Sequence, residues 1–318
     1  MLHITNGNAA IDVMHAAGLP GTFLPWDDVL HDGPVPAGLP LEALSTVRGR
    51  HLWHRGWVAP ESAALEAFAD RDRALSRFRE HDEVVLWFEH DLYDQLQLAQ
   101  LLDWFADQEM GGVALTMVCG AEYLGPSTPE RLAARFGERE AVTDAQVALG
   151  EAAWNAFRSP DPTAVSACVD GDTAALPWMA GALHRHLEQF PSVRDGFSRS
   201  ERQALESLAD GPSTPRDLFI AHNRREDPVW LEDSTFVAYL HDLAGGEIPL
   251  IRLAPADNPY DMHRTVEMTD AGRAVLDGRE DRVRLCGIDR WLGGVHLRGH
   301  AVGWRWSADE GRLVVAEI

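Results

Sequence analysis

Short apolar runs that end in polar residues recur along the first part of the chain, and a helical pattern follows each of them. The clearest run covers residues 84–88 and gives way at once to Glu89, His90 and Asp91. Residues 92–105 then carry apolar side chains at helical spacing. In an open α/β sheet, a buried strand brings polar groups to the crevice at its carboxyl end before the chain returns through a helix. This pattern therefore predicts a parallel strand at 84–88 and a helix at 92–105.

The same alternation predicts a Rossmann-like, open and mainly parallel sheet in the N-terminal part, followed by further helices. Turn-forming residues such as Gly, Pro and Asn separate the predicted elements. Further strands are expected at 2–5, 22–24 and 112–119, and further helices at 9–17, 41–50, 62–80, 130–136, 144–157 and 176–190.

The order of the predicted elements changes in the C-terminal part. Helical patterns at 200–209, 214–221 and 231–244 precede strand-like runs at 248–253 and 264–268, which is the order of a winged helix-turn-helix.

We therefore predict two domains, an α/β domain with a helical extension at 1–193 and a smaller, α+β winged-helix-like domain with a C-terminal β-hairpin at 194–318. The third of these helices, at 231–244, carries three acids and no Arg over its first twelve residues. A helix that reads DNA needs cations for the phosphates, so this module is expected to contact a protein rather than DNA.

Charge narrows the classes of function further. The chain has 50 acidic and 28 basic residues, a formal net charge of −22, which disfavours binding to nucleic acid or to anionic membranes. Every basic residue is Arg, and no Lys occurs. Enzymes that need a Walker-A Lys or a Schiff-base Lys are therefore excluded.

Three well-separated cysteines and the absence of any C-x-x-C or H-E-x-x-H motif predict neither a disulfide framework nor a zinc site. The chain also lacks a signal-peptide pattern at its start and any apolar run of 18 residues. We therefore expect an acidic, cytoplasmic protein without membrane segments. The sequence assigns no metal ligand and leaves the cofactor open.

Three predicted strand ends carry the candidate chemistry, because polar residues cluster at 6–8, 27–34 and 89–95. A His beside carboxylates can act as a general base, and the same oxygens can bind Mg²⁺. The candidate catalytic residues are Asp28, His31, Glu89, His90 and Asp91. The candidate ligand-binding residues are Asn6, Gly7, Asn8, Asp32, Gly33 and Gln95.

Local structure offers alternative explanations for several of these residues. Asp91 is well placed to cap the following helix with Asp94 in its first turn, and Asn6 or Asn8 can cap the helix at 9–17. A helix N-terminus there also offers its N–H groups to an anion. Glu89 and His90 are the hardest to explain by structure alone.

Residues 2–7 (LHITNG), 26–34 (WDDVLHDGP) and 86–95 (LWFEHDLYDQ) together resemble the bacterial domain-of-unknown-function family 1835. The resemblance covers roughly residues 1–125, and the segment around 287–295 resembles the end of that family's usual C-terminal extension. It implies that the three motifs lie at strand ends, and it names no activity. The family pattern has an acid after Asn-Gly where this chain has Asn8, so the resemblance implies no metal ligand there.

These observations fit two main functions. The first is an α/β domain that binds a nucleotide-like or phosphorylated small molecule at its strand ends and acts as a hydrolase or transferase through a His/Asp site. The second is a non-enzymatic ligand sensor or regulatory adaptor whose winged-helix module contacts a protein partner. A nuclease is disfavoured by the charge of −22 and the lack of Lys.

Overall fold

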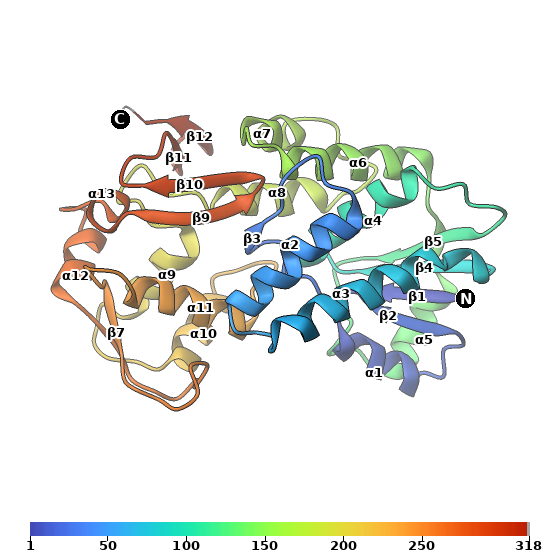
Figure 1. The fold of residues 1–318 in the computed structure, drawn as a ribbon, viewed down its shortest axis with the longest axis horizontal. Coiled ribbons are helices and arrows are strands. Elements are labelled where there is room, and N and C mark those ends of the chain that lie inside the picture. The colour runs from blue at the N-terminus through green and yellow to red at the C-terminus, as the bar shows by residue number, and fades with distance from the viewer. Residues whose placement is uncertain (317–318) are drawn as a thin grey trace. The chain divides into compact units, whose positions relative to one another are not determined.

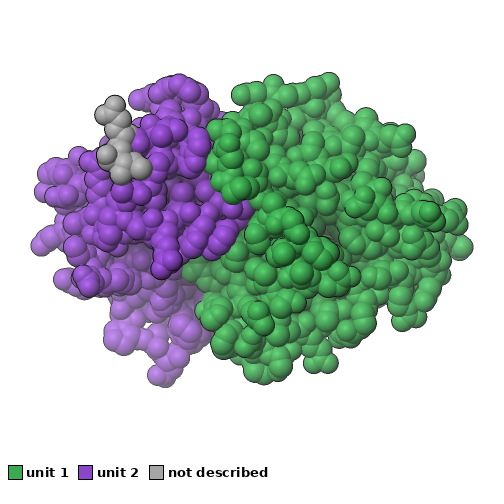
Figure 2. All heavy atoms as spheres, turned by 45° about the horizontal axis from the view of Figure 1, so that its top comes forward, with its two compact units in different colours: residues 1–183 green, residues 184–318 purple. Residues whose placement is uncertain are grey.

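The structure is a computed structural model that describes residues 1–316 of the chain. The chain divides into two compact units, Met1–Leu183 (unit 1) and His184–Ile318 (unit 2) (Figure 2). The domain boundary predicted between residues 193 and 194 lies a little further along the chain and stays a prediction.

Unit 1 is built on a five-stranded, mainly parallel sheet with the order β2-β1-β4-β5-β6 (Figure 1). Its strands are β1 (Leu2–Thr5), β2 (Thr22–Pro25), β4 (Glu83–Phe88), β5 (Ala114–Cys119) and the edge strand β6 (Glu140–Ala141). The first four run parallel, whereas β6 is antiparallel to β5. The predicted α/β class with a mainly parallel sheet is therefore confirmed, and the register brings the carboxyl ends of β1 and β4 side by side, with Thr5 opposite Trp87.

Helices lie between these strands and after the last of them (Figure 1). They are α1 (Asn8–Ala16), α2 (Leu41–His54), α3 (Glu61–Ser76), α4 (Leu92–Ala106), α5 (Pro129–Gly137), α6 (Asp144–Arg158) and α7 (Thr163–Val169), with a 3₁₀ turn at Phe78–Glu80 and a two-residue strand β3 at Gly33–Pro34. The sequence predicted these α-helices with shifted ends, except α7. Helix α8 (Met179–Leu187) is shorter than the predicted 176–190.

The central strand β4 is buried on both faces, as its continuous apolar run predicts. On one face Val85 and Trp87 pack with Met14 of α1 and Leu132 of α5. Helix α4 packs against β4 and α6, and almost every residue in its first three turns is buried. Burial of each large apolar side chain contributes about 1.5–3 kcal/mol, so β4 and α4 form a rigid base for the residues between them.

Unit 2 contains the three helices and two strands predicted for the C-terminal part. They are α9 (Arg199–Ser207), α10 (Pro215–Asn223), α11 (Asp233–Ala244) and the antiparallel pair β7 (Ile251–Leu253) and β8 (Val266–Met268). Two short helices follow, α12 (Asp270–Leu276) and α13 (Arg282–Cys286).

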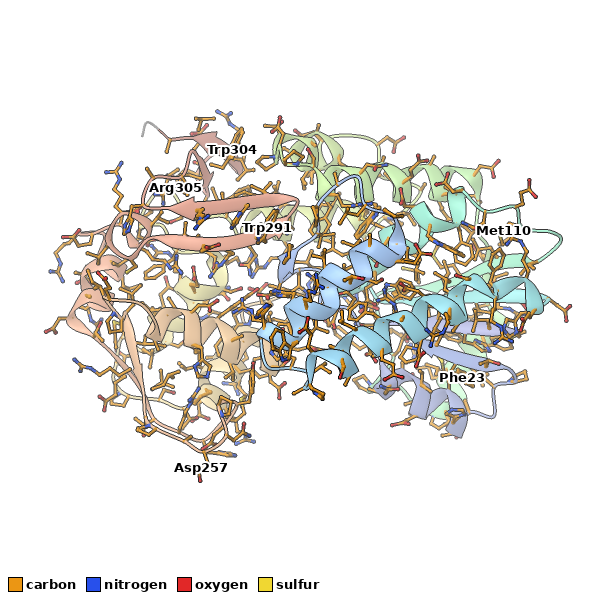
Figure 3. All side chains as sticks on the ribbon, in the orientation of Figure 1. Phe23, Met110, Asp257, Trp291, Trp304 and Arg305 are labelled. Atoms are coloured by element: carbon orange, nitrogen blue, oxygen red, sulfur yellow. The ribbon has the colours of Figure 1, made fainter. Side chains whose placement is uncertain are left out.

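The C-terminal part of unit 2 holds two β-hairpins where the sequence indicated one hairpin element. They are β9 (Ile288–Gly293) with β10 (Val295–Gly299), and β11 (Trp304–Ser307) with β12 (Arg312–Val315). Trp291 and Trp304 belong to different hairpins (Figure 3). Among residues 1–316, no helix is both long and apolar enough to cross a membrane.

Candidate functional site

The site begins where β1 and β4 end. Helix α1 leads from β1 to its neighbour β2 on one side, and α4 leads from β4 to β5 on the other side. Such a reversal of strand order opens a crevice at the carboxyl ends, where open α/β proteins bind their ligands. Asn6 and Glu89 are the residues that directly follow these two strands.

Three carboxylates meet at this position, and we call Glu89, Asp91 and Asp94 the carboxylate cluster. One oxygen from each lies within 4.8 Å of the others. Local hydrogen bonds orient all three. Asp91 caps α4 by accepting bonds from the backbone N of Tyr93 (2.9 Å) and of Asp94 (3.1 Å). Asp94 accepts from the backbone N of Glu89 (2.8 Å), and Glu89 accepts from the backbone N of Leu124 (2.6 Å).

Long-range hydrogen bonds join Asn6 to this cluster. Its Nδ2 donates to Oδ2 of Asp94 at 2.6 Å, and its Oδ1 accepts from Nε2 of Gln97 at 3.0 Å. Gln95 adds a bond from its Nε2 to the backbone O of Glu89 at 2.7 Å. The ends of β1 and β4 and the first turns of α4 therefore form one polar network, which includes four of the sequence-predicted residues: Asn6, Glu89, Asp91 and Gln95.

Burial raises the pKa of every carboxyl in the cluster, and repulsion by neighbouring carboxylates adds to the shifts of Glu89 and Asp91. The pKa of Glu89 rises to about 8, first through burial and then through the charge of Asp94, while Arg135 offsets part of the shift. Burial raises the pKa of Asp94 to about 6, although hydrogen bonds from Glu89 and Asn6 oppose this. Burial and Asp94 also raise the pKa of Asp91 well above its usual range. Without a bound cation, the cluster therefore holds protons at neutral pH.

This proton uptake predicts that stability falls as pH rises. The folded protein binds these protons more tightly than the unfolded chain, whose carboxyl pKa values lie near 4. The stabilisation is complete below that value and is lost up to a pH of about 8, the pKa of Glu89. In a buffer with chelator, we expect the melting temperature to drop between about pH 5 and about pH 9. Glu89→Gln should flatten the upper half of this drop, and an unchanged slope in the variant would contradict the assignment.

The other candidate acids, Asp28 and Asp32, belong to buried ion pairs next to this network. Asp28 and Arg48 are both fully buried, and Nε of Arg48 donates to Oδ1 of Asp28 at 2.9 Å. Asp32 accepts from Arg55 (2.7 and 2.8 Å) and contacts Nε2 of His51 at 2.6 Å. Burial raises the pKa of Asp32, but these two partners more than offset it and hold the pKa below its usual range. Both carboxylates anchor the 27–34 loop, and their assigned roles in catalysis and ligand binding stay predictions.

The two candidate histidines lie among aromatic rings. The buried ring of His31 meets Tyr93 of α4 edge-on, with centroids 4.8 Å apart. The half-buried ring of His90 lies 5.3 Å from Tyr123 and 5.5 Å from Trp178. Of the two, His90 is the one that directly adjoins the carboxylate cluster in the chain, and its catalytic role stays a prediction.

Gly33 lies in a tight turn whose packing requires glycine. Its φ is +89°, and a Cβ at this position would lie 2.3 Å from Nε2 of His51. Any side chain would therefore displace the imidazole that pairs with Asp32. The ligand-binding role assigned to Gly33 stays a prediction, and its packing role explains why the loop has glycine there.

The N-terminus of α1 resolves one of the alternatives for Asn6 and Asn8. Gly7 is the N-cap residue, and no side chain caps the helix. Asn8 is the first helical residue, and its Nδ2 approaches Asp27 at a weak 3.5 Å. The interpretation of Asn6 or Asn8 as a plain N-cap is therefore wrong, and the N–H groups of the exposed first turn face no capping side chain.

Asp27 is a residue that the candidate set omitted. It has a left-handed backbone with φ +39°, the only positive φ of a non-glycine residue in the described chain. Its backbone N donates to the backbone O of Asn6 at 2.9 Å. Left-handed backbone at a non-glycine residue costs energy and often occurs at functional sites. This strain places an exposed carboxylate beside Gly7, where a Cβ would lie 3.4 Å from Asp27 Oδ1.

Three further residues of the site, Asp94, Gln97 and Arg135, were not among the candidates predicted from the sequence. Asp94 was explained by its favourable position in the first turn of α4, and its bond to Asn6 spans 88 positions of the chain. Gln97 was not considered. Arg135 acts on Glu89 electrostatically from α5, and no local pattern marks it. The spacing of Asp91 and Asp94, three apart at a helix start, was the only signal that could have indicated two carboxylates on one surface.

A cavity of about 440 Å³ lies beside this polar network. Its lining residues include Gln95, Cys119, Arg135 and Trp178. Burial raises the pKa of Cys119 to about 11. Its thiol therefore stays protonated at neutral pH and is a poor nucleophile.

A scan of the chain against models of known protein families gives no match, and a search of curated proteins finds no significantly similar sequence. The resemblance to family 1835 therefore stays a prediction.

Proposed function

We propose that unit 1 binds a phosphorylated or nucleotide-like small molecule together with a divalent cation, and acts on it as a hydrolase or transferase. The observation that carries this proposal is the convergence of the Glu89, Asp91 and Asp94 carboxylates within 4.8 Å, at the point where the strand order reverses. Open α/β sheets bind ligands at this point.

A divalent cation is the partner that this cluster best fits. Carboxylate oxygens are the ligands that Mg²⁺ and Ca²⁺ prefer. Glu89 accepts its backbone hydrogen bond through Oε1, and Asp91 accepts both of its backbone hydrogen bonds through Oδ1, so the second oxygen of each carboxylate takes no part in these bonds. Asp94 would act mainly by positioning, since it holds the backbone of Glu89 and the side chain of Asn6. Binding of the cation would displace the protons that the cluster otherwise retains.

The proposal places a phosphate group between this cation and the N-terminus of α1, which follows the end of β1 after Asn6 and Gly7. The uncapped first turn of α1 offers N–H groups and the positive end of the helix dipole. Asp27 and the cluster would repel a phosphate on their own, and the chain has no Lys to offset them. A bound cation would remove that repulsion and stabilise the charge that develops during phosphoryl or related transfer. His90 is our candidate general base.

For unit 2 we propose the winged-helix-like arrangement, formed by α9, α10 and α11 with the β7–β8 hairpin. Its third helix, α11, has most of its residues from Thr235 to Leu243 buried, and its first turn is acidic. A DNA-reading helix must expose a basic face to the groove. These features support a structural or protein-binding role for unit 2 rather than DNA recognition.

The test is a thermal-shift screen of phosphorylated metabolites with and without millimolar Mg²⁺. We expect at least one compound to raise the melting temperature only when Mg²⁺ is present. Asp91→Asn should abolish the shift, because Asn still caps a helix but removes a charged ligand. Asp103→Asn is the matched control, since Asp103 also lies on α4 and has its pKa raised to about 6 by burial, but stands outside the cluster. The proposal fails if no compound shifts the wild type, or if Asp91→Asn responds like the control.

A further inference from the structure

The cavity beside the carboxylate cluster has room for a second part of the ligand. Its volume of about 440 Å³ lies in the range of small-molecule pockets, roughly 300–1,000 Å³. Gln95 links it to the cluster, since this residue lines the cavity and donates to the backbone O of Glu89. Arg135 also lines the cavity and acts electrostatically on Glu89.

Trp178 gives this cavity an exposed aromatic wall. The side chain lies just before α8 and is 36% exposed, which is unusual for so large an apolar residue in this chain. Its ring meets the ring of His90 at 72°, with centroids 5.5 Å apart, so the indole is held next to the segment that follows β4. An exposed aromatic face in a cavity is a surface on which a planar ring stacks.

Polar groups in the same wall match the edge of a nucleobase. Gln95 is only 1% exposed, and its Oε1 accepts no hydrogen bond from residues 1–316, so a ligand N–H would satisfy it. Arg135 supplies a guanidinium, of which one nitrogen donates to the backbone O of Glu122 at 3.3 Å. Nucleobases combine a planar ring with N–H donors and with acceptors at the edge. A sugar phosphate without a base would leave the Trp178 face uncovered.

We infer that the ligand of unit 1 is a nucleotide whose base occupies this cavity and stacks on Trp178, while its phosphates lie at the carboxylate cluster. This inference rests on the proposed function, because the phosphates and the cation are those of the site at β1 and β4. It adds the substrate class and a specificity residue, Trp178, that takes no part in the chemistry.

The experiment is calorimetric titration with Mg²⁺ and each of five probes: ADP, GDP, CDP, UDP and inorganic pyrophosphate. At least one nucleotide should bind about fivefold or more tightly than pyrophosphate, because stacking of one base is worth at least about that factor. Trp178→Ala should remove most of this advantage and leave pyrophosphate binding unchanged, and Trp178→Phe should retain much of it. Trp53→Ala is the control, since Trp53 is 37% exposed but does not line this cavity.

The outcomes separate this inference from the proposal beneath it. If pyrophosphate binds with Mg²⁺ but no nucleotide binds more tightly, the nucleotide inference is overturned and the phosphate site stands. Equal losses for nucleotide and pyrophosphate in Trp178→Ala would overturn the stacking role in the same way. If none of the five probes binds, the nucleotide inference is overturned, and the metabolite screen with Mg²⁺ decides separately whether the proposed function stands.

Discussion

Replacing Arg48 with alanine should lower the free energy of unfolding of unit 1 by about 3–5 kcal/mol, the typical cost of removing one partner from a buried ion pair. Arg48 is fully buried on α2, and its guanidinium forms hydrogen bonds with several groups of the 27–34 loop. It donates to the carboxylate of Asp28 and to the backbone oxygens of Val29, Asp32 and Pro34. Within the described part of the chain, the truncation would leave the buried Asp28 charge with Arg71, 3.8 Å away, and would leave four acceptors without the donor they share.

Chemical denaturation of unit 1, followed by tryptophan fluorescence, measures this loss. Arg50→Ala is the matched control, because Arg50 lies on the same helix in an exposed pair with Glu61 and such pairs contribute about 0–1 kcal/mol. We expect the control to differ little from the wild type. If Arg48→Ala lowered the free energy of unfolding no more than the control does, Arg48 would not be the residue that holds the 27–34 loop in place.

The double substitution Glu89→Gln and Asp91→Asn should weaken Mg²⁺ binding at least about 100-fold. Loss of a residue that merely orients a metal ligand already lowers metal affinity about 10–100-fold. Both substitutions preserve size and keep an oxygen for the backbone bonds from Leu124, Tyr93 and Asp94. They remove the charges that repel each other, so the double variant should also melt at a higher temperature than the wild type above about pH 8. Loss of affinity with a gain in stability separates a ligand site from a structural one.

Asp103→Asn again serves as control, because it removes a carboxyl whose pKa burial raises to about 6 without touching the cluster. It should leave Mg²⁺ binding unchanged. A double variant that binds Mg²⁺ as tightly as Asp103→Asn would show that the cation, if any, binds elsewhere. A double variant that is less stable than the wild type at high pH would show that the carboxylates do not repel each other as described.

The sequence predicted the sheet of unit 1 well because the signals for it are local. The run at 84–88 is continuous and apolar, as a strand buried on both faces requires, and it became β4 with one added residue, Glu83. Helix α4 was predicted from its apolar spacing. Its polar residues Gln95, Gln97 and Gln100 are nevertheless buried, because they pair with the strand ends and with Trp26. Periodicity cannot show such pairing.

The site was only partly predictable, because contacts between residues far apart in the chain leave no local signal in the sequence. Asn6, Glu89 and Asp91 were identified because each stands at a predicted strand end or helix start. Asp28 and Asp32 were chosen for the density of ionisable groups in their loop, but their partners Arg48 and Arg55 come from α2, and nothing in the loop itself indicates them. Asp94 had an adequate local explanation as a first-turn acid, and its bond to Asn6 depends on how β1 and β4 pair.

The most direct test of the central claim counts the protons that leave when the cation binds. Mg²⁺ is titrated into the protein near pH 7 in two buffers of different ionisation enthalpy, and the difference in heat gives the proton release. Because Glu89 has a pKa of about 8 and ligands must be deprotonated to bind metal, we predict one Mg²⁺ per chain with release of about one proton from Glu89. Asp91, whose pKa is also raised well above its usual range, should add to this release. Glu89→Gln should bind more weakly and release less. Binding without proton release, or no binding at all, would contradict a cation site at the carboxylate cluster.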